Sequence, residues 1–490
     1  MTLKLHNTLT GELEEFTPHT PDRVTLYTCG PTVYDYLTVG NWSAYVYWDI
    51  LVRTLLSNGY TVERVMNLTD VGHLVSDADE GEDKLEKGAR REGKTAWEVA
   101  EFYAEDFLQG MEQLGLIPPE HITKATDYIP QQLSLVRTLK EKGYTYQTTD
   151  GIYFDTEKFS RYADFARLDL AAQKAGARVE QNDEKRQPWD FALWKFTPTG
   201  QKRDMEWETP ADLLELPPNP DEPIMGFPGW HLECSAMAMD ILGESIDIHT
   251  GGIDHIPVHH TNEIAQSEAA TGKQFANYWL HNNHLKIDGG KISKSLGNGY
   301  TLHDLADKGY DGMDLRMFVL QGQFTNEGNF TFDNLDAAHN RLKNWRGYAV
   351  LRHQTHDRLN NDCDKNDSEN YVSLLATSGA VREALNDNLN TPFALSIIDE
   401  AFDKLDSQPL QNIHRHGLVQ VLEAVDELLG LQLMEHTPDI SDDHKRVILE
   451  RERARDNKDW AKSDELRDTL LAEGIAVRDT ATGTVWQYAQ

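Results

Sequence analysis

Two of the three cysteines in this 490-residue chain lie in segments whose residue types could bind a metal ion. Cys29 lies in LYTCGPTVYDY, and Cys234 lies in GWHLECSAMAMDIL. Downstream, in HHTNEIAQSE, His259 and Glu263 are four residues apart and therefore share one face of a helix. Two thiolates, one imidazole and one carboxylate could together form a four-coordinate zinc site. A long stretch of chain separates Cys29 from the other three residues, so only the fold could bring them together.

A second set of residues could bind phosphate groups. TVGN at 38–41 places Gly40 where a strand gives way to a helix, and there free backbone amides and the positive helix end can meet a phosphate. KISKS at 291–295 places Lys291 and Lys294 on a loop rich in serine and glycine, from which their ammonium groups could reach a triphosphate. Each motif alone also has a plainer interpretation, as a simple connection or as an exposed basic loop.

The composition is typical of a water-soluble protein of several domains. A chain of 490 residues exceeds what one hydrophobic core usually supports, so roughly two to four domains are expected. An apolar fraction of 39% and a mean hydropathy of -0.58 fit a globular protein, and no stretch approaches the ~20 apolar residues that span a bilayer. The first residues lack the charged-then-apolar pattern of a signal peptide. Three cysteines without regular spacing favour a reducing cytoplasm over a disulfide framework.

The formal net charge of -34 argues at first against a nucleic-acid partner, because phosphate binding requires local lysine and arginine. A basic stripe can nevertheless lie on an acidic body. Segments 88–94, 339–353 and 444–462 are candidates for such a stripe. From charge alone, we favour the interpretation of these segments as solvated helix faces.

The first part of the chain alternates between strand and helix patterns. RVTLYTC at 23–29 is apolar and β-branched, a turn-rich segment follows, and the next segment has a helical periodicity that ends near Gly59. TVERVMNLTDV is then a second strand, and this βαβ unit predicts a parallel, doubly wound sheet. From about 130 to 225, short aromatic strands predict an insertion. Beyond 300, apolar residues at three-to-four spacing predict helices.

The motifs taken together resemble those of one enzyme family. CGPTVYDY, TVGN, PGWHLECSAM, HHTNEIAQSEAA and KISKSLGN, in this order, look like class I aminoacyl-tRNA synthetases, and specifically cysteinyl-tRNA synthetases. The likeness extends from NTLTGELEEF through GARVEQNDEKRQPWDFALWK to the closing RARDNKDWAKSDELRDTLLAEGIAVRDTATGTVW. The resemblance implies ATP-dependent ligation of cysteine to its tRNA through a cysteinyl-adenylate. It implies ATP bound with Mg²⁺, and we expect a cytoplasmic monomer.

The resemblance assigns the four candidate metal ligands to one zinc ion per chain. Cys29, Cys234, His259 and Glu263 match the family's zinc ligands, and in that family the metal binds the sulfur of the substrate cysteine. Zinc favours thiolate over hydroxyl, so such a metal distinguishes cysteine from isosteric serine better than packing can. The alternative is a closed structural zinc, which predicts four protein ligands and no room for a substrate.

Three further residues match positions that line the family's cysteine pocket. They are Thr69 in NLTD, and Trp230 and His231 in PGWH. Without the resemblance, a lone threonine or tryptophan is more often a core or capping residue, and a lone histidine is more often structural.

The resemblance also assigns the phosphate-binding residues, with one departure. The family pattern reads His-Ile-Gly-His or His-Ile-Gly-Asn, whereas this chain reads Thr38-Val39-Gly40-Asn41. A threonine hydroxyl can donate a hydrogen bond as the family's histidine does, but it is shorter and never positively charged. Lys291 and Lys294 of KISKS are both present, and Lys294 matches the phosphate-contacting lysine of the family.

The patterns and the resemblance together predict an α/β protein. A Rossmann-like parallel-sheet catalytic domain is split by an insertion and is followed by a helical bundle and a small C-terminal anticodon-recognition domain. The predicted bounds are 1–130 and 226–288 for the halves of the catalytic domain, 131–225 for the connective insertion, 289–335 for the KISKS loop and linker, 336–440 for the bundle, and 441–490 for the C-terminal domain.

Two other functions are compatible with part of this pattern. A related ligase joins cysteine to an amino sugar with the same zinc and adenylate chemistry, but it would have no use for an anticodon-reading tail. A catalytically silent relative that binds tRNA or cysteine as a regulator is supported only by Thr38. Cysteine-dependent exchange between ATP and pyrophosphate would separate the three functions.

Overall fold

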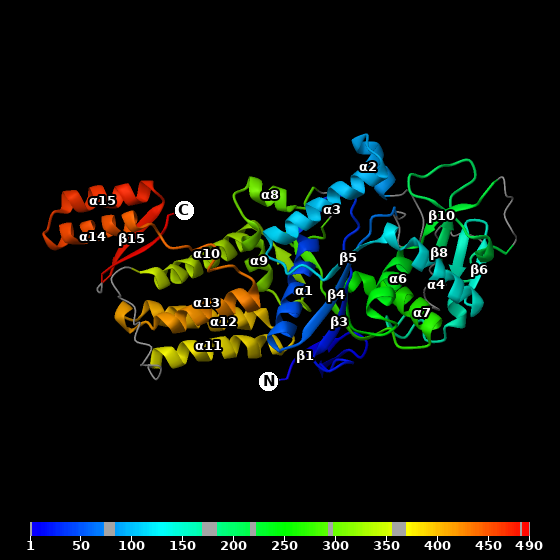
Figure 1. Ribbon diagram of the computed structural model, residues 1–490, viewed down its shortest axis with the longest axis horizontal. Coiled ribbons are helices and arrows are strands. Elements are labelled where there is room, and N and C mark those ends of the chain that lie inside the picture. Colours follow the sequence, from blue (N-terminus) through cyan, green and yellow to red (C-terminus); the bar gives the residue numbers. More distant parts are fainter. Residues whose placement is uncertain are drawn as a thin grey trace.

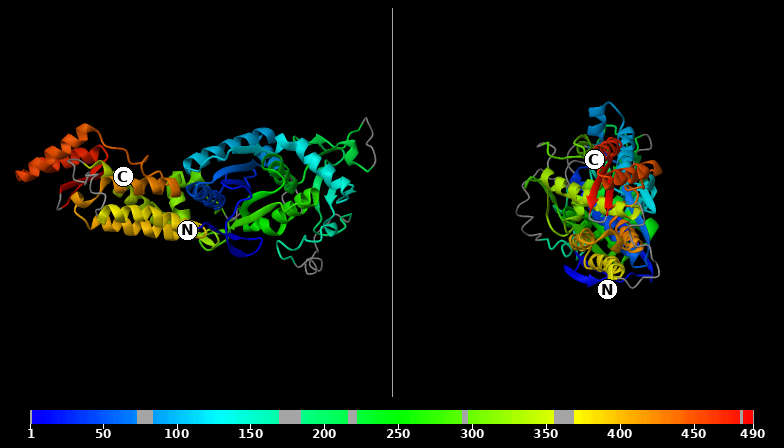
Figure 2. Two further views of the ribbon diagram at one scale, coloured as in Figure 1. Left: turned by 60° about the horizontal axis from the view of Figure 1, so that its bottom comes forward. Right: turned by 90° about the vertical axis from the view of Figure 1, so that its left-hand side faces the viewer.

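The computed structural model of the chain is an elongated molecule (Figure 1). The sheet-containing N-terminal part lies between the inserted segment at one end and the helical and C-terminal parts at the other (Figures 1 and 2). The structure describes residues 2–72, 84–168, 184–215, 222–292, 297–354, 369–480 and 483–489.

Five parallel strands among the described residues form the central sheet, in the order β12-β11-β3-β4-β5. The strand order reverses beside β3, because the chain adds β4 and β5 on one side and β11 and β12 on the other. In open parallel sheets, ligands bind outside the carboxyl ends of the strands at such a point. The parallel sheet confirms the predicted fold class. The strands are β3 (Arg23–Thr28), β4 (Thr61–Leu68), β5 (His121–Lys124), β11 (Ile246–Gly252) and β12 (Ala276–Asn282).

Helices between these strands pack against the sheet. The helix α1 (Val39–Ser57) contacts β4 and β11 and is buried along most of its length, including Trp42 and Trp48. The helices α6 (Trp230–Leu242) and α7 (Thr261–Thr271) pack on one another, and α6 also contacts β3 and β4. Within the described ranges, none of the helices combines the length and apolar character that crossing a membrane requires.

The insertion between β5 and α6 forms a second, antiparallel sheet in the order β6-β7-β8-β10-β9. Aromatic side chains hold it together, for example Phe154 and Phe191, whose rings stack at 5.0 Å. These residues belong to a hydrophobic core of the insertion, which also includes residues of α6 and α7. The elements are α4 (Ile129–Glu141), β6 (Thr145–Thr148), β7 (Gly151–Phe154), β8 (Phe191–Phe196), β9 (Trp207–Glu208) and β10 (Met225–Pro228).

The second half of the chain is mainly helical and ends in a small α/β unit. Figure 1 shows this unit at one end of the molecule. It has its own core, in which Ile448, Leu470 and Trp486 pack together. The remaining elements of the chain before α9 are β1 (Lys4–Asn7), β2 (Glu12–Glu15), α2 (Lys84–Glu92), α3 (Ala96–Gln113), β13 (Leu285–Ile287), α8 (Leu302–Asp307) and β14 (Gly328–Phe330). The later elements are α9 (Gly312–Leu320), α10 (Phe332–Ala349), α11 (Glu369–Asn386), α12 (Thr391–Asp406), α13 (Arg415–Leu429), α14 (Asp442–Asp456), α15 (Trp460–Ala472), β15 (Ile475–Thr480) and β16 (Gly483–Tyr488).

A buried group of charges joins α1 to the helical part. Arg316 on α9 donates to the carboxylate of Asp49 on α1, to the carbonyl oxygen of Leu429 at 2.7 Å and to that of Leu114 at 2.9 Å. Arg53 donates to the same carboxylate at 2.6 Å. Burial opposes ionisation of Asp49, but the two guanidinium groups hold its pKa below the usual value. The helix that begins at the TVGN turn is therefore fixed to the end of α13 by charged groups.

Replacing Arg316 by methionine should destabilise the protein strongly. Arg316→Met leaves part of the Asp49 charge and two carbonyl oxygens without partners in a fully buried place. Breaking one side of a buried ion pair costs about 3–5 kcal/mol, and we expect a loss in this range in urea unfolding followed by near-ultraviolet circular dichroism. Arg446→Ala, which breaks an exposed pair with Asp443, should leave the transition in place. Equal transitions for both variants would contradict a structural role for the buried pair.

Candidate metal and nucleotide site

Four side chains from separate parts of the chain meet at the carboxyl edge of the central sheet. Cys29 follows β3, Cys234 lies on α6, and Glu263 lies in the first turn of α7. His259 lies in a short π-helical turn, Ile256–His260, that leads into α7. One ligand atom from each residue lies within 4.8 Å of the others, and all four side chains are buried. The sequence-predicted set is thus brought together, and it could hold a metal ion.

Two glycines allow the elements that carry the cysteines to approach closely. A Cβ atom at Gly30 would lie 1.6 Å from the carbonyl oxygen of Asn67, so only glycine fits between the ends of β3 and β4. A Cβ atom at Gly229, the residue before α6, would lie 1.9 Å from the carbonyl oxygen of Ala192. Both glycines stand within five residues of a cysteine of the cluster. They fix where the backbone presents the two thiols.

Burial and proximity set the charges of the cluster when no ion is bound. Burial raises the pKa of Cys29 well above its usual value, and the neighbouring Cys234 raises it further. The hydrogen bond from Cys29 lowers the pKa of Cys234 to about 6, although burial opposes this. Burial alone would lower the pKa of His259, but Glu263 and Cys234 raise it to about 10. At pH 7 the ion-free cluster therefore holds a Cys29 thiol, a Cys234 thiolate, an imidazolium and a carboxylate.

The donor set and its geometry fit a zinc ion. His259 Nε2 and Glu263 Oε1 lie 2.7 Å apart, so these two ligand atoms converge on one small region beside the sulfur atoms. Thiolate, imidazole and carboxylate are the ligands that zinc takes in proteins, usually four at a time. A second set replaces Cys234 and His259 by two other histidines but shares Cys29 and Glu263. The first set supplies two thiolates, which zinc prefers over hard ligands.

Two buried histidines contact two of the four ligands from outside the set. His249 Nε2 lies 2.7 Å from the second carboxylate oxygen of Glu263, and His231 Nδ1 lies 3.0 Å from His259 Nδ1. Such contacts orient a ligand and leave its other atom for the metal. Sequence reasoning missed His249, because a single histidine on a strand has no spacing signal. His231 was predicted to bind substrate; it is fully buried and lies behind His259.

A series of three hydrogen bonds connects Thr8 to Cys29 through two buried histidines. Thr8 Oγ1 lies 2.7 Å from His281 Nδ1, His281 Nε2 lies 2.7 Å from His260 Nδ1, and His260 Nε2 lies 3.4 Å from Cys29 Sγ. If the Thr8 hydroxyl donates, each ring accepts at Nδ1 and donates at Nε2. The chain then ends with an N–H group directed at the sulfur of Cys29. His260 and His281 were not singled out by sequence reasoning.

The cluster opens into a cavity of about 740 Å³ that also reaches the TVGN turn. Cys29, Cys234 and His259 line it, whereas Glu263 and His231 do not. The cavity therefore exposes three of the four candidate ligands to whatever it holds. The other sequence-predicted residues along its wall are Thr38, Gly40, Asn41, Thr69, Trp230 and Lys291.

At the other end of this cavity, the TVGN turn begins α1. Thr38 is the residue before the helix, and its hydroxyl donates to Asn41 Oδ1 at 2.9 Å, as its backbone N–H does at 3.0 Å. The hydroxyl proton of Thr38 is therefore used inside the turn. A Cβ atom at Gly40 would lie 2.5 Å from Ile292 Cδ1, so the turn packs tightly on the second residue of KISKS. Lys294 lies outside the described residues.

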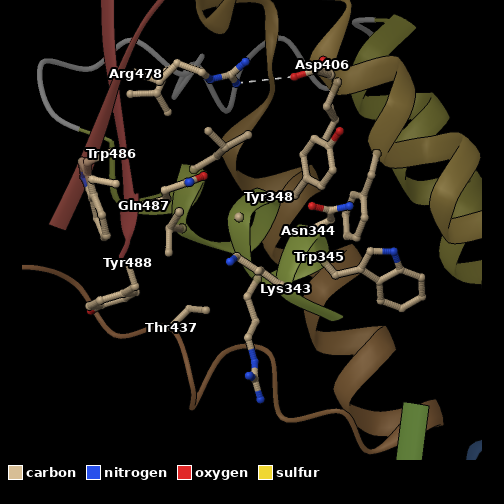
Figure 3. A pocket seen from close by; sticks show the side chains of 18 of the residues that line it. Lys343, Asn344, Trp345, Tyr348, Asp406, Thr437, Arg478, Trp486, Gln487 and Tyr488 are labelled. Carbon is tan, nitrogen blue, oxygen red and sulfur yellow. Dashed lines mark ion pairs between the residues drawn. The ribbon is translucent and has the colours of Figure 1, made fainter. Parts of the chain in front are cut away.

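A second cavity of about 810 Å³ lies between the helical part and the C-terminal unit. Figure 3 shows Lys343, Asn344 and Tyr348 of α10 on one side and Gln487 and Tyr488 of β16 on the other. The ion pair between Arg478 and Asp406, 3.6 Å long, joins the two walls. Basic, acidic and aromatic side chains line this cavity, and none of the candidate metal ligands is among them.

Two family profiles match most of the chain. The family described as "tRNA synthetases class I (C) catalytic domain" matches residues 15–340. The family described as "Cysteinyl-tRNA ligase anticodon binding domain" matches residues 437–486. The two matches are separated by most of the helical part.

Curated relatives match nearly the whole chain. A cysteine–tRNA ligase of Treponema denticola is 38% identical over 518 aligned residues, which cover 99% of this chain and 100% of the relative. "Cysteine--tRNA ligase 1" of Burkholderia lata is 42% identical over 488 residues, covering 99% of this chain and 96% of the relative. Among solved structures, methionyl-tRNA synthetase of Mycobacterium tuberculosis with methionyl-adenylate has a TM-score of 0.60 at 14% identity and covers 84% of this chain and 93% of its own. This likeness shows the fold alone.

Zinc binding at neutral pH should release about two protons. The Cys29 thiol and the His259 imidazolium must both lose a proton to become ligands, while Cys234 and Glu263 are already ionised. Zinc affinity should therefore rise with pH below the pKa of His259. Calorimetric titration in buffers of different ionisation enthalpy measures the number. His259→Gln should release about one proton fewer, and proton-neutral binding by the unaltered protein would contradict the described charge states.

Proposed function

This chain belongs to the cysteine–tRNA ligase family of class I aminoacyl-tRNA synthetases, and we propose that Cys29, Cys234, His259 and Glu263 bind the zinc ion with which it recognises its amino acid. The chain ligates cysteine to its tRNA at the expense of ATP. A regulator without activity and a ligase for an amino sugar do not fit this membership, because the relatives are tRNA ligases over their full length and a profile described as anticodon-binding matches the tail.

One observation carries the proposal for the metal. Three of the four candidate ligands line the cavity that also contains the TVGN turn, so a ligand in that cavity can reach the ion. A closed structural zinc would instead be sealed by protein on every side. When bound, zinc supplies a Lewis acid that prefers a thiolate to a hydroxyl, and the cysteine side chain is thereby separated from serine. Thr69 and Trp230, both on the cavity wall, would position the rest of the amino acid.

The nucleotide occupies the other end of the cavity in this proposal. The backbone amides of Gly40 and Asn41 at the start of α1, together with Lys291, would face the phosphate groups of ATP and its Mg²⁺ ion. Thr38 would act through the turn, because its hydroxyl donates to Asn41. Lys294, predicted from the KISKS motif, would contact the phosphates as pyrophosphate leaves.

The reaction has two steps, and neither needs a side-chain nucleophile. The carboxylate of cysteine attacks the α-phosphorus of ATP, which gives cysteinyl-adenylate and releases pyrophosphate. A terminal ribose hydroxyl of the tRNA then attacks the acyl carbon, and AMP leaves. The protein contributes by orienting the reactants and by stabilising the charge that develops on the phosphates.

The C-terminal unit would recognise the anticodon, within the predicted bounds 441–490. Its profile match supports this role. The cavity beside the unit offers aromatic and basic side chains such as Tyr348 and Lys343, together with four aspartates. An overall charge of -34 does not by itself exclude RNA binding, because charge can be distributed unevenly over a surface. A monomer in the cytoplasm is the proposed state, in line with three cysteines that have no regular spacing.

Replacing Cys234 by serine tests the role of the metal. Cys234→Ser should lower the zinc content and raise the KM for cysteine by about 10–100-fold in ATP–pyrophosphate exchange, because a thiolate ligand is lost. Metal analysis and exchange kinetics on the same preparation measure both. Met239→Leu, on the same helix, is the matched control and should change neither. If zinc is lost while cysteine activation stays unchanged, the metal is only structural.

Replacing Thr38 by histidine tests the TVGN turn. A histidine there would add an imidazole that can donate to a phosphate, and we expect cysteine-dependent ATP–pyrophosphate exchange to be equal or faster. The same variant loses the hydroxyl that donates to Asn41. A loss of activity of tenfold or more, with folding intact by circular dichroism, would show that the turn depends on the threonine.

A further inference from the structure

We infer that Tyr27 is a positioning residue of the metal site and that its hydroxyl donates a hydrogen bond to the Cys234 sulfur when zinc is bound. The inference rests on the proposed zinc site and adds to it a side chain that is not itself a ligand. It concerns how the ligands are held, and therefore how tightly and in which electronic state the metal is bound.

The strand geometry directs Tyr27 toward the cluster. Tyr27 lies on β3 two residues before Cys29, and side chains two residues apart on a strand point to the same face. The ring of Tyr27 lies 5.1 Å from the ring of His249, which contacts Glu263 from outside the cluster. Tyr27 is therefore within the layer of side chains that surrounds the four ligands.

The hydroxyl of Tyr27 is fully buried and makes no hydrogen bond of ordinary geometry in the part of the chain that the structure describes, but it interacts with the nearby side chain of Cys234. A buried hydroxyl without a well-formed hydrogen bond costs free energy and calls for an explanation, such as an ion that completes the site. A phenol keeps its proton at neutral pH, so the hydroxyl of Tyr27 can act as a donor.

Tyr27 can supply the hydrogen-bond donor that Cys234 lacks. Outside the four ligands themselves, Glu263 has His249, His259 has His231, and Cys29 has His260 as a buried partner. Among the described residues, no histidine outside the four ligands hydrogen-bonds to Cys234. Tyr27 is a buried donor without a hydrogen bond of ordinary geometry, and it lies next to Cys234. A zinc-bound thiolate is an anion, and hydrogen bonds to anions are the strong ones.

The alternative is that Tyr27 only fills space in the sheet. Its ring packs in the main hydrophobic core, and a phenylalanine would fill nearly the same volume. In that case removal of the hydroxyl would leave metal binding unchanged and would stabilise the protein both with and without zinc. The two interpretations therefore predict different zinc affinities when the hydroxyl is removed.

The experiment compares Tyr27→Phe with the unaltered full-length chain. Zinc affinity is measured by competition with a chromophoric chelator, and the cobalt-substituted protein gives the sulfur-to-metal charge-transfer band. We expect zinc affinity to fall by about 10–100-fold, as for other partners of metal ligands, and the band to move to lower energy because the sulfur becomes more electron-rich. The ion-free variant should unfold at an equal or higher urea concentration.

Two further proteins serve as controls. Tyr278→Phe, on strand β12 of the same sheet, loses a hydroxyl that donates to the carbonyl oxygen of Glu15 and should alter neither affinity nor spectrum. Tyr27→3-fluorotyrosine keeps the shape and makes the hydroxyl a stronger donor, so the band should move to higher energy. If Tyr27→Phe folds poorly, the cobalt spectrum of the 3-fluorotyrosine protein still tests whether the hydroxyl donates to the sulfur.

The outcomes separate the two proposals. If the unaltered protein binds zinc and neither change at position 27 alters its affinity or its cobalt spectrum, the role of Tyr27 is overturned while the zinc site stands. If the unaltered, folded protein binds no zinc, the proposed metal site itself is wrong.

Discussion

Three side chains that form anions when they lose a proton, Cys29, Cys234 and Glu263, are buried within 4.8 Å of one another. Like charges at this distance in a buried place cannot all persist without a cation, because neither water nor salt screens them. In the ion-free protein one of the three keeps its proton and His259 carries the balancing charge. A divalent ion satisfies all three at once. The surrounding strands, helices and buried histidines keep these side chains close together despite their repulsion, in an arrangement that a metal ion could occupy.

The fold supplies the arrangement through its sheet. Parallel strands end on one edge, and the reversal of strand order beside β3 leaves a crevice there. Cys29 comes from the strand end, while Cys234 and Glu263 come from α6 and α7, which pack on each other. Gly30 allows the end of β3 to approach β4 closely enough to fix the position of Cys29. The same edge carries the start of α1, so one cavity connects the metal-ligand cluster with the TVGN turn.

Much of this was predictable from the sequence, for reasons that differ between residues. The βαβ pattern at 23–71 predicted the parallel sheet, because strand and helix periods differ strongly in apolar sequences. The spacing of His259 and Glu263, and the long motifs around the cysteines, predicted which residues meet. Tyr27 and His249 could not be found this way, because their role depends on which buried atoms face each other in three dimensions. The domain bounds and the role of Lys294 stay predictions.

The two groups that lie beside the sulfur atoms, His260 and Tyr27, are neutral donors, and this has a physical reason. A lysine or arginine beside the thiolates would stabilise them but would also repel a divalent ion. Burial and the surrounding histidines lower the pKa of His260 well below its usual value, so its ring stays uncharged. A neutral N–H group can still donate to the sulfur of Cys29, at 3.4 Å. The phenol of Tyr27 has the same character, because a phenol is an uncharged donor at neutral pH. Neutral donors stabilise the anionic sulfur atoms without placing a positive charge next to the position where a divalent ion would bind.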